Sequence, residues 1–259
     1  MSQKHPKALP FLFFSEMWER FGYYLMIGIF LLYLKNVEHG FAMTNSEASD
    51  LYGTFIALVF LTPFIGGLLA DRYFGYRRSI IAGGIMMGVG YCMMAVHSLP
   101  MLYLSMALVI FGNGFFKPNI STLLGNLYSA PEFIHRKDEG YNIFYMGINV
   151  GAFICNFFSA AIIIIWGWKY AFVAAGVGMF LGVIIFMAGT KHYANGDVRK
   201  PMTKEDMPFS KIVLTIFIPA IIAGILGWII PKNIFGSDST DAFIFACIPV
   251  IYFYTSLYI

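Results

Sequence analysis

Three ionisable residues stand close together near the start of the chain, inside a stretch that is otherwise apolar. Glu16, Glu19 and Arg20 are three and four positions apart, so they share one face of a helix. Two carboxylates against one guanidinium leave a spare acid, and a buried acid can take up and release a proton. A self-neutralising ion pair that only helps the helix insert is the alternative, although it would need a single carboxylate.

The helix that positions this cluster is long enough to cross a membrane. An apolar run extends from about Leu9 to Leu34, and a bilayer requires about 20 residues at 1.5 Å each. A charged side chain at the centre of a membrane helix costs about 2.5–3.5 kcal/mol on insertion scales. We therefore expect the charged face to meet other helices or a water-filled cavity, not lipid.

The composition extends this interpretation to the whole chain. Of the 259 residues, 59% are hydrophobic and only 12% are charged, against about 25% charged in soluble domains. No alternating ten-residue strands typical of a β-barrel are evident. We predict an all-α integral membrane protein that inserts in a lipid bilayer. Its eight expected spans are 10–35, 49–71, 78–97, 100–127, 140–165, 168–190, 211–231 and 241–259.

Basic residues give an orientation and a division of the chain. Most of the 17 lysines and arginines fall on one side of the expected spans, which predicts a cytoplasmic N-terminus in the cell's inner membrane. The polar stretch 191–210 is expected to be a cytoplasmic linker between a six-helix bundle, residues 1–190, and two further helices, residues 211–259. Because the last run reaches Ile259 without a polar flank, we expect the natural protein to continue.

A lysine lies in the middle of the fourth expected span. Asn113, Lys117 and Ser121 are spaced by four and form a second polar stripe, and Pro118 is expected to bend the helix. A desolvated ammonium needs a carboxylate partner. Away from the ends of the expected spans only the two glutamates of the first cluster can supply one, so we predict one shared network. An isolated structural lysine is the alternative.

Amides recur every seven residues on the fifth expected span. Asn142, Asn149 and Asn156 follow this repeat, with Tyr145 on the same side. Such a ladder can join helices through hydrogen bonds worth about 1 kcal/mol or less each. For Asn149, interhelical glue and contact with a substrate remain equally open.

A turn with an acid, an arginine and a glycine follows the second expected span. Asp71 can cap the next segment or pair with an arginine, Arg72 adds positive charge, and Gly75 permits a tight turn. This pattern indicates a hinge or latch rather than a ligand site.

Other chemistries leave no trace in the sequence. The HExxH, P-loop and nucleophile-elbow motifs are missing, as are metal-ligand spacings. We expect no enzyme activity, no metal, no cofactor beyond a coupling proton and no nucleic-acid partner.

Three spaced motifs resemble a known transporter family. The stretch 16–24 reads E-x-x-E-R-F-x-Y-Y, residues 144–151 read F-Y-x-x-I-N-x-G, and Lys117 falls where that family carries its fourth-helix lysine. They resemble the proton-dependent oligopeptide transporters (POT) of the major facilitator superfamily, whose turn pattern D-R-x-x-G-x-R-R also matches residues 71–78. The last two spans resemble the helix pair that bacterial members insert between two six-helix bundles. The C-terminal bundle would then be absent from this chain.

The resemblance implies proton-coupled import of di- and tripeptides by alternating access. Proton coupling would involve Glu16, Glu19, Arg20 and Lys117, and the substrate pocket would include Tyr23, Tyr24, Lys117 and Asn149. Two pocket positions depart from the family pattern: Ile27 replaces a frequent arginine and Phe60 a frequent tyrosine. Because a fixed donor for a carboxylate is lost at Ile27, a different small solute is an alternative substrate. A half-transporter that packs without transporting is another alternative.

Overall fold

The computed structural model describes residues 5–198, 208–230, 234 and 238–256, and this part of the chain is helical without strands. The all-α prediction is confirmed. The long helices are α1 (Leu9–Lys35), α2 (Asn45–Leu69), α3 (Tyr76–Met94), α4 (Leu99–Leu127), α5 (Lys137–Trp166), α6 (Trp168–Ala188), α8 (Ile218–Ile229) and α9 (Asp238–Ser256). Short helical segments are η1 (Ala70–Phe74), η2 (Ile134–Arg136), η3 (Thr190–His192), α7 (Phe209–Ile212) and η4 (Val213–Phe217).

The chain divides into two compact units. The first comprises Met1–Ala42 and Val59–Lys200, and the second comprises Met43–Leu58 and Pro201–Ile259. The boundary after Lys200 falls inside the expected linker 191–210, of which residues 199–207 lie outside the described part. The division into 1–190, 191–210 and 211–259 stays a prediction, and residues 43–58 group with the second unit.

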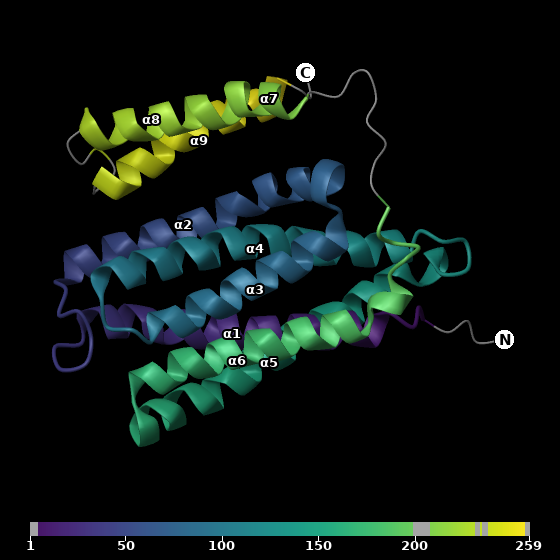
Figure 1. Cartoon of the computed structure of the whole chain (residues 1–259), viewed down its shortest axis with the longest axis horizontal. Helices are drawn as coiled ribbons and strands as arrows, with labels where there is room; N and C mark the ends of the chain where they lie inside the picture. Colours follow the sequence, from purple (N-terminus) through teal and green to yellow (C-terminus); the bar gives the residue numbers. More distant parts are fainter. Residues whose placement is uncertain (1–4, 199–207, 231–233, 235–237, 257–259) are drawn as a thin grey trace. The chain divides into compact units, whose positions relative to one another are not determined.

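Helix α1 is the centre of the first unit. It packs against α5 and α6, while α3 packs against α4 and α6 (Figure 1). Small residues allow these close approaches. A Cβ on Gly182 of α6 would lie 3.0 Å from the carbonyl oxygen of Ser15, and one on Gly147 of α5 would lie 2.9 Å from that of Phe13. The charged turn of α1 is therefore enclosed by neighbouring helices.

Pro118 shapes the contact between α4 and the later part of α2. Since proline has no N–H, the carbonyl of Gly114 loses its donor four residues on. Gly66 packs against that carbonyl so closely that a Cβ would overlap it. The amide of Asn119 donates to the carbonyl of Phe115 at 2.7 Å, and α4 continues as one helix through the proline. The missing N–H of Pro118 thus leaves the carbonyl of Gly114 free for the close approach of α2. The predicted bend of α4 stays a prediction.

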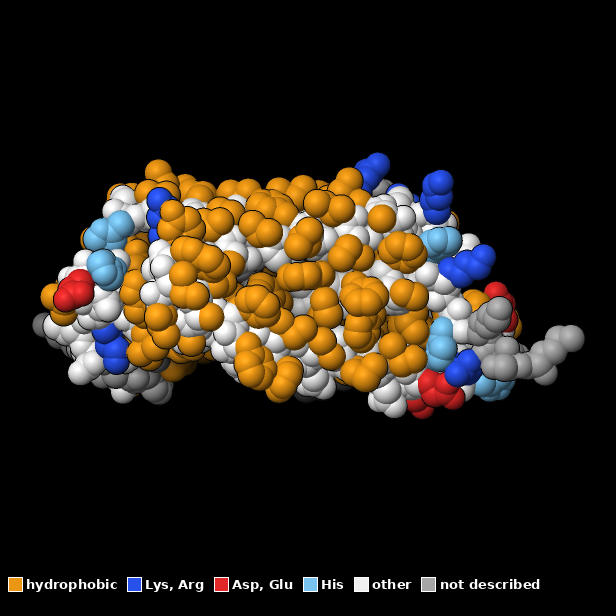
Figure 2. Space-filling view, turned by 90° about the horizontal axis from the view of Figure 1, so that it is seen from below, with side chains coloured by type: hydrophobic (Ala, Val, Ile, Leu, Met, Phe, Trp, Pro, Cys, Tyr) orange, Lys and Arg blue, Asp and Glu red, His pale blue; other side chains and the backbone are white. Residues whose placement is uncertain are grey.

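Several helices meet the requirements for crossing a membrane. By length and composition the described part holds four such segments: Asn45–Phe74, Leu99–Leu127, Ile134–Trp166 and Trp168–Ala188. Figure 2 shows a face covered by hydrophobic side chains, with charged and histidine side chains gathered at its two ends. The chain is a multi-pass membrane protein. The remaining four of the eight expected spans stay predictions. One of them is the span of α1, whose internal charges lower its hydropathy.

In the second unit, α8 and α9 form a helix pair. A Cβ on Gly227 would come within 2.7 Å of Cβ of Phe245 and 2.8 Å of the carbonyl oxygen of Asp241. Asp241 is buried, and its carboxylate accepts a hydrogen bond from the backbone N–H of Ile234 at 2.9 Å. A glycine contact and a paired acid therefore fix the end of this hairpin.

Candidate functional site

The three ionisable residues of α1 form one enclosed cluster, which we call the acid cluster. Glu16, Glu19 and Arg20 are 2%, 0% and 4% exposed. The Nε of Arg20 lies 3.1 Å from Oε1 of Glu16 and also pairs with Oε2 of Glu19. One guanidinium thus faces two carboxylates in the interior of the bundle. Because charges interact strongly where water is excluded, a proton added to either acid changes the energy of the whole cluster.

Lys117 of α4 lies within electrostatic range of the acid cluster. It is half-buried and interacts electrostatically with Glu16, Glu19 and Arg20. Its Nζ lies 5.2 Å from the centroid of the Phe60 ring, within the range of a cation–π interaction. The ammonium therefore has an aromatic face beside it and two acids near it, which is the proximity that the sequence pattern predicts.

The other half of the polar stripe on α4 binds the helices together. Asn113 is buried, and its Nδ2 donates to the carbonyl of Val59 at 2.9 Å. The carbonyl of Ser121 accepts a hydrogen bond from the hydroxyl of Tyr141 at 3.1 Å. Only the middle member of the stripe, Lys117, carries a charge. The side chain of Asn113 has a structural partner, and Ser121 has one through its backbone carbonyl.

The aromatic residues after the acid cluster face different surroundings. Tyr23 is buried with its ring centroid 5.3 Å from Cζ of Arg20, whereas Tyr24 is 38% exposed. Ile27 is half-buried, and Phe60 is 66% exposed. Tyr23 therefore packs against the guanidinium, while Tyr24 and Phe60 are accessible. The predicted substrate roles of these four residues stay predictions.

The amides of α5 lie on its exposed side. Asn142, Asn149 and Asn156 are exposed, as is Tyr145 between them. Asn149 makes no hydrogen bond to another helix within the described part of the chain. The structure thus offers no interhelical partner for this residue in the first unit, and its role as a substrate contact stays a prediction.

The turn between α2 and α3 is tied to the segment that follows α6. Gly75 adopts a positive φ of 78°, which a residue with a side chain rarely adopts. Asp71 accepts a hydrogen bond from the buried hydroxyl of Tyr76. Arg77 contacts Asp197 through its backbone N–H at 3.2 Å and through Nε at 3.7 Å. These contacts tie the turn to the segment after α6, and its role as a hinge or latch, with Arg72 in it, stays a prediction.

Two residues of these sites escaped the sequence analysis. Asp197 is 120 positions from Arg77, and no pattern in the chain links them. Tyr91 of α3 is fully buried and interacts electrostatically with Glu19 and Arg20. A lone tyrosine in a glycine-rich apolar helix gives no signal in the sequence, because only the packing of α3 on α1 brings it to the acid cluster.

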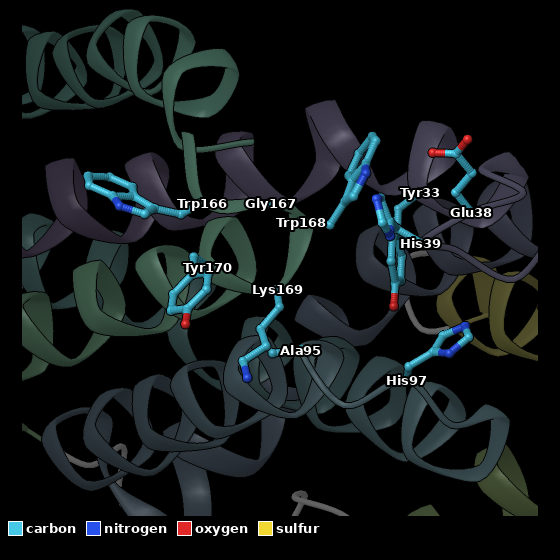
Figure 3. Close-up of a pocket in the computed structure, with 10 residues that line it drawn as sticks. All are labelled: Tyr33, Glu38, His39, Ala95, His97, Trp166, Gly167, Trp168, Lys169 and Tyr170. Carbon is cyan, nitrogen blue, oxygen red and sulfur yellow. The ribbon is translucent and has the colours of Figure 1, made fainter. Parts of the chain in front are cut away.

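A pocket of about 470 Å³ lies at the end of the first unit opposite the turn between α2 and α3. Its residues come from the connections after α1, after α3 and between α5 and α6, as Figure 3 shows. They include Tyr33, Glu38, His97, Trp168 and Lys169. None of the sequence-predicted site residues lines this pocket. Among the described residues no His, Cys, Asp and Glu cluster has the size of a metal site.

Comparison with known proteins gives one consistent family. The family model described as "POT family" matches residues 77–223, more than half of the chain. The "Uncharacterized transporter YclF" of Bacillus subtilis (strain 168) is 36% identical over 256 residues, covering 96% of this chain and 51% of the relative. "Dipeptide and tripeptide permease A" of Pectobacterium carotovorum subsp. carotovorum (strain PC1) is 32% identical, covering 88% and 44%. The chain spans about half the length of these relatives.

Solved structures agree in fold. A crystal structure of "peptide transporter POT (E310Q mutant)" aligns with a TM-score of 0.78 at 34% identity, covering 96% of this chain and 52% of that one. A POT family transporter in complex with a thioalcohol-conjugated peptide gives 0.75 at 31% identity, covering 86% and 46%. Another, in complex with 5-aminolevulinic acid, gives 0.72 at 27% identity, covering 90% and 55%.

Proposed function

We propose a function from the premise that the chain belongs to the proton-dependent oligopeptide transporter (POT) family. The natural protein imports di- and tripeptides across the cytoplasmic membrane together with protons. The observation that carries this proposal is the enclosed acid cluster of α1, with Lys117 of α4 in its electrostatic range. Members of this family are transporters, and the chain is accordingly not an enzyme.

The acid cluster explains how a proton changes the state of the bundle. When Glu19 is charged, Arg20 is shared between it and Glu16. A proton on Glu19 removes one negative charge, so Arg20 turns fully to Glu16 and the electrostatic attraction on Lys117 falls. The lysine is then released to meet another anion, such as the carboxylate of a peptide. Proton binding and substrate binding are thereby coupled through charge.

We expect residues of three helices, α1, α4 and α5, to hold the substrate. Lys117 supplies a positive charge for the peptide carboxylate, Tyr24 supplies an aromatic ring with a hydroxyl, and Asn149 supplies an amide that both donates and accepts. Tyr24 and Asn149 are exposed and Lys117 is half-buried, which leaves all three side chains available to a ligand. Phe60 and Ile27 give the same region an apolar character.

A second six-helix bundle is the proposed partner of this chain. The relatives are about twice as long as the matched region, and alternating access needs two bundles that move against each other. Lys117 would pair with a carboxylate of that bundle in one of the two states. A protein that ends at Ile259 would transport only as an assembly, so the chain length in the native source separates a transporter from a packing module.

A different small solute is the second candidate substrate. Ile27 provides no guanidinium for a peptide C-terminus, and a relative at 27% identity is known in complex with 5-aminolevulinic acid. That ligand carries one amine and one carboxylate separated by as many chain atoms as in a dipeptide, but it has no peptide bond. The positive charge of Lys117 alone can bind the carboxylate of such a ligand.

The test is uptake by the full-length natural protein in proteoliposomes. With an imposed inward proton gradient, dipeptides and tripeptides should accumulate, and accumulation should stop when an ionophore removes the gradient. If only amino acids or other metabolites accumulate, the second candidate replaces the first. Uptake that is indifferent to the gradient would falsify proton coupling.

Orientation is part of the same proposal. The N-terminus and the turn between α2 and α3 should face the cytoplasm, because Lys and Arg concentrate in that group of connections. Single cysteines at Ser129 and Val96, both exposed and at opposite ends of α4 and α3, report this directly. A membrane-impermeant thiol reagent added to intact cells should label Val96→Cys and spare Ser129→Cys.

A further inference from the structure

One tyrosine of α3 is buried with its hydroxyl unsatisfied. The side chain of Tyr91 is 0% exposed, and its hydroxyl finds no hydrogen-bond partner within the described residues. A buried hydroxyl without a partner destabilises the fold, because it has lost its hydrogen bonds to water. Retention of such a group is explained when it gains its partner in another protonation state of a neighbouring site.

Tyr91 lies against the turn of α1 that carries the acid cluster. A Cβ built on Gly22 would lie 3.4 Å from Cε2 of Tyr91, the ring carbon next to the one that bears the hydroxyl. Gly22 follows Glu19 by three positions, so the two share one face of α1. The phenol interacts electrostatically with both Glu19 and Arg20. The hydroxyl therefore belongs to the surroundings of Glu19.

Glu19 has an oxygen that matches this donor. Its Oε2 pairs with Arg20, whereas its Oε1 is buried and accepts no hydrogen bond from the part of the chain that the structure describes. A phenol can donate to a carboxylate, and such a charge-assisted bond is roughly twice as strong as a neutral one. An unused donor and an unused acceptor are thus buried in the same region, on two residues that interact electrostatically.

The other charged groups near Glu19 lie on α1 and α4. Glu16 and Arg20 on α1 form the ion pairs of the cluster, and Lys117 approaches from α4. The remaining titratable neighbour of Tyr91 is Tyr23, which packs on Arg20. Among the described groups with an electrostatic effect on Glu19, α3 contributes none that is charged.

We propose that Tyr91 is a positioning residue whose hydroxyl donates a hydrogen bond to Oε1 of Glu19 when Glu19 is ionised. The bond forms by a rotation of the carboxylate and breaks when the proton returns. It holds the carboxylate in place for Arg20 and sets the pH at which the cluster exchanges its proton. The consequence for transport rests on the proposed function, whereas the hydrogen bond itself does not.

The variant Tyr91→Phe tests the bond, since it keeps the ring that packs against Gly22 and removes only the hydroxyl. Infrared difference spectra of the full-length protein between acid and alkaline pH follow the carboxyl band of Glu19, identified by its loss in Glu19→Gln. Losing the donor disfavours the ionised form. The pH of half-titration of this band should rise by about one unit, which is a tenfold change in the equilibrium.

Tyr193 provides a matched control. It is also 0% exposed with a hydroxyl that has no hydrogen-bond partner among the described residues, but it stacks on Phe186 at a ring distance of 4.6 Å, near Arg77. Tyr193→Phe should leave the half-titration pH of the Glu19 band unchanged. A shift of the same size in both variants would mean that any buried hydroxyl acts through packing, which overturns the proposal.

Transport by the same variants separates the hydrogen bond of Tyr91 from the proposed proton coupling. In Tyr91→Phe the pH profile of gradient-driven uptake should move upward with KM for the substrate unchanged. An unshifted infrared band together with inactive Glu19→Gln overturns the role of Tyr91 alone. Full accumulation by Glu19→Gln overturns the coupling proposal instead.

A second measurement needs no folded Tyr91→Phe protein. In the unmutated protein with isotopically labelled tyrosine, one tyrosine C–O band should change with the ionisation of Glu19, and this change should vanish in Glu19→Gln. Tyrosine bands that are the same at both pH values would overturn the hydrogen bond.

Discussion

The acid cluster of α1 and the amide stripe of α5 carry similar patterns and have opposite surroundings. Glu16, Glu19 and Arg20 are enclosed and paired with one another, whereas Asn142 and Asn149 are exposed. Both sets repeat at helical spacing, so spacing alone does not distinguish them. What differs is the neighbouring side chains: Tyr91 of α3 and Lys117 of α4 approach the charged face of α1, whereas the amides of α5 are exposed within the first unit.

This difference assigns different physical tasks to the two regions. In an enclosed cluster each charge depends on its partner, so one proton has a large effect on the energy of the others. On an exposed face the same side chains contribute little to stability and are free to meet a ligand. Substitutions in the two regions should therefore differ in their effects on transport and on stability.

Replacing the acid that pairs with Arg20 should remove proton coupling. Glu19→Gln keeps the shape of the side chain but cannot bind or release a proton, so proton-driven accumulation should fall to background while some counterflow exchange remains. Uptake and exchange by the full-length protein in proteoliposomes measure both. Glu132→Gln, an exposed acid in the connection after α4, is the matched control and should transport normally. Unmutated levels of accumulation in Glu19→Gln would remove the acid cluster from the mechanism.

The lysine of α4 near the acid cluster should matter for both proton coupling and substrate binding. Lys117→Ala should abolish gradient-driven uptake, because it removes the positive charge that interacts with the acid cluster. The same charge is the proposed partner of the substrate carboxylate. Lys169→Ala removes an exposed ammonium that lies 5.5 Å from the ring centroid of Tyr170 and should leave uptake unchanged. Normal uptake by Lys117→Ala would return this residue to a structural role.

The acid cluster could be predicted from the sequence because helical periodicity fixes which residues share a face, and burying three charges requires a protein interior. The exposure of Asn149 could not, since it depends on which helix lies beside α5. The same holds for Tyr91, which reaches Glu19 through the packing of α3 on α1, and for Asp197, which meets Arg77 from 120 positions away. Local patterns thus gave the helices and the charged face, and tertiary packing decided their neighbours.

A pair of amides tests the difference in burial through stability. Asn113→Ala removes a buried amide that donates to Val59 at 2.9 Å, so the loss of one hydrogen bond and of packing should lower the free energy of unfolding by about 1–2 kcal/mol. Asn149→Ala should change it by less than about 0.5 kcal/mol, because this side chain is exposed. Chemical unfolding in detergent measures both. Equal losses would identify Asn149 as interhelical glue and end its assignment to the substrate.

The smallest effect concerns a buried hydroxyl that does have a partner. Tyr128 follows α4, is 0% exposed and is hydrogen-bonded to Nδ1 of His5 at 2.6 Å. Its replacement by Phe should cost about 0.5–1.5 kcal/mol near neutral pH. Burial raises the pKa of Tyr128 to about 12, so between about pH 10 and 12 the unfolded chain loses this proton while the folded chain keeps it.

Because a raised pKa in the folded state means stability that is lost as the pH rises, the unmutated protein should weaken through that window, and Tyr128→Phe should lack this part of the loss. The gap between the two proteins should therefore narrow from pH 8 to pH 11 in chemical unfolding. A gap that stays constant would show that the phenol ionises alike in both states. Tyr128 would then be as accessible to water as the residues of the α5 face, and burial by itself would not separate the enclosed polar groups from the exposed ones.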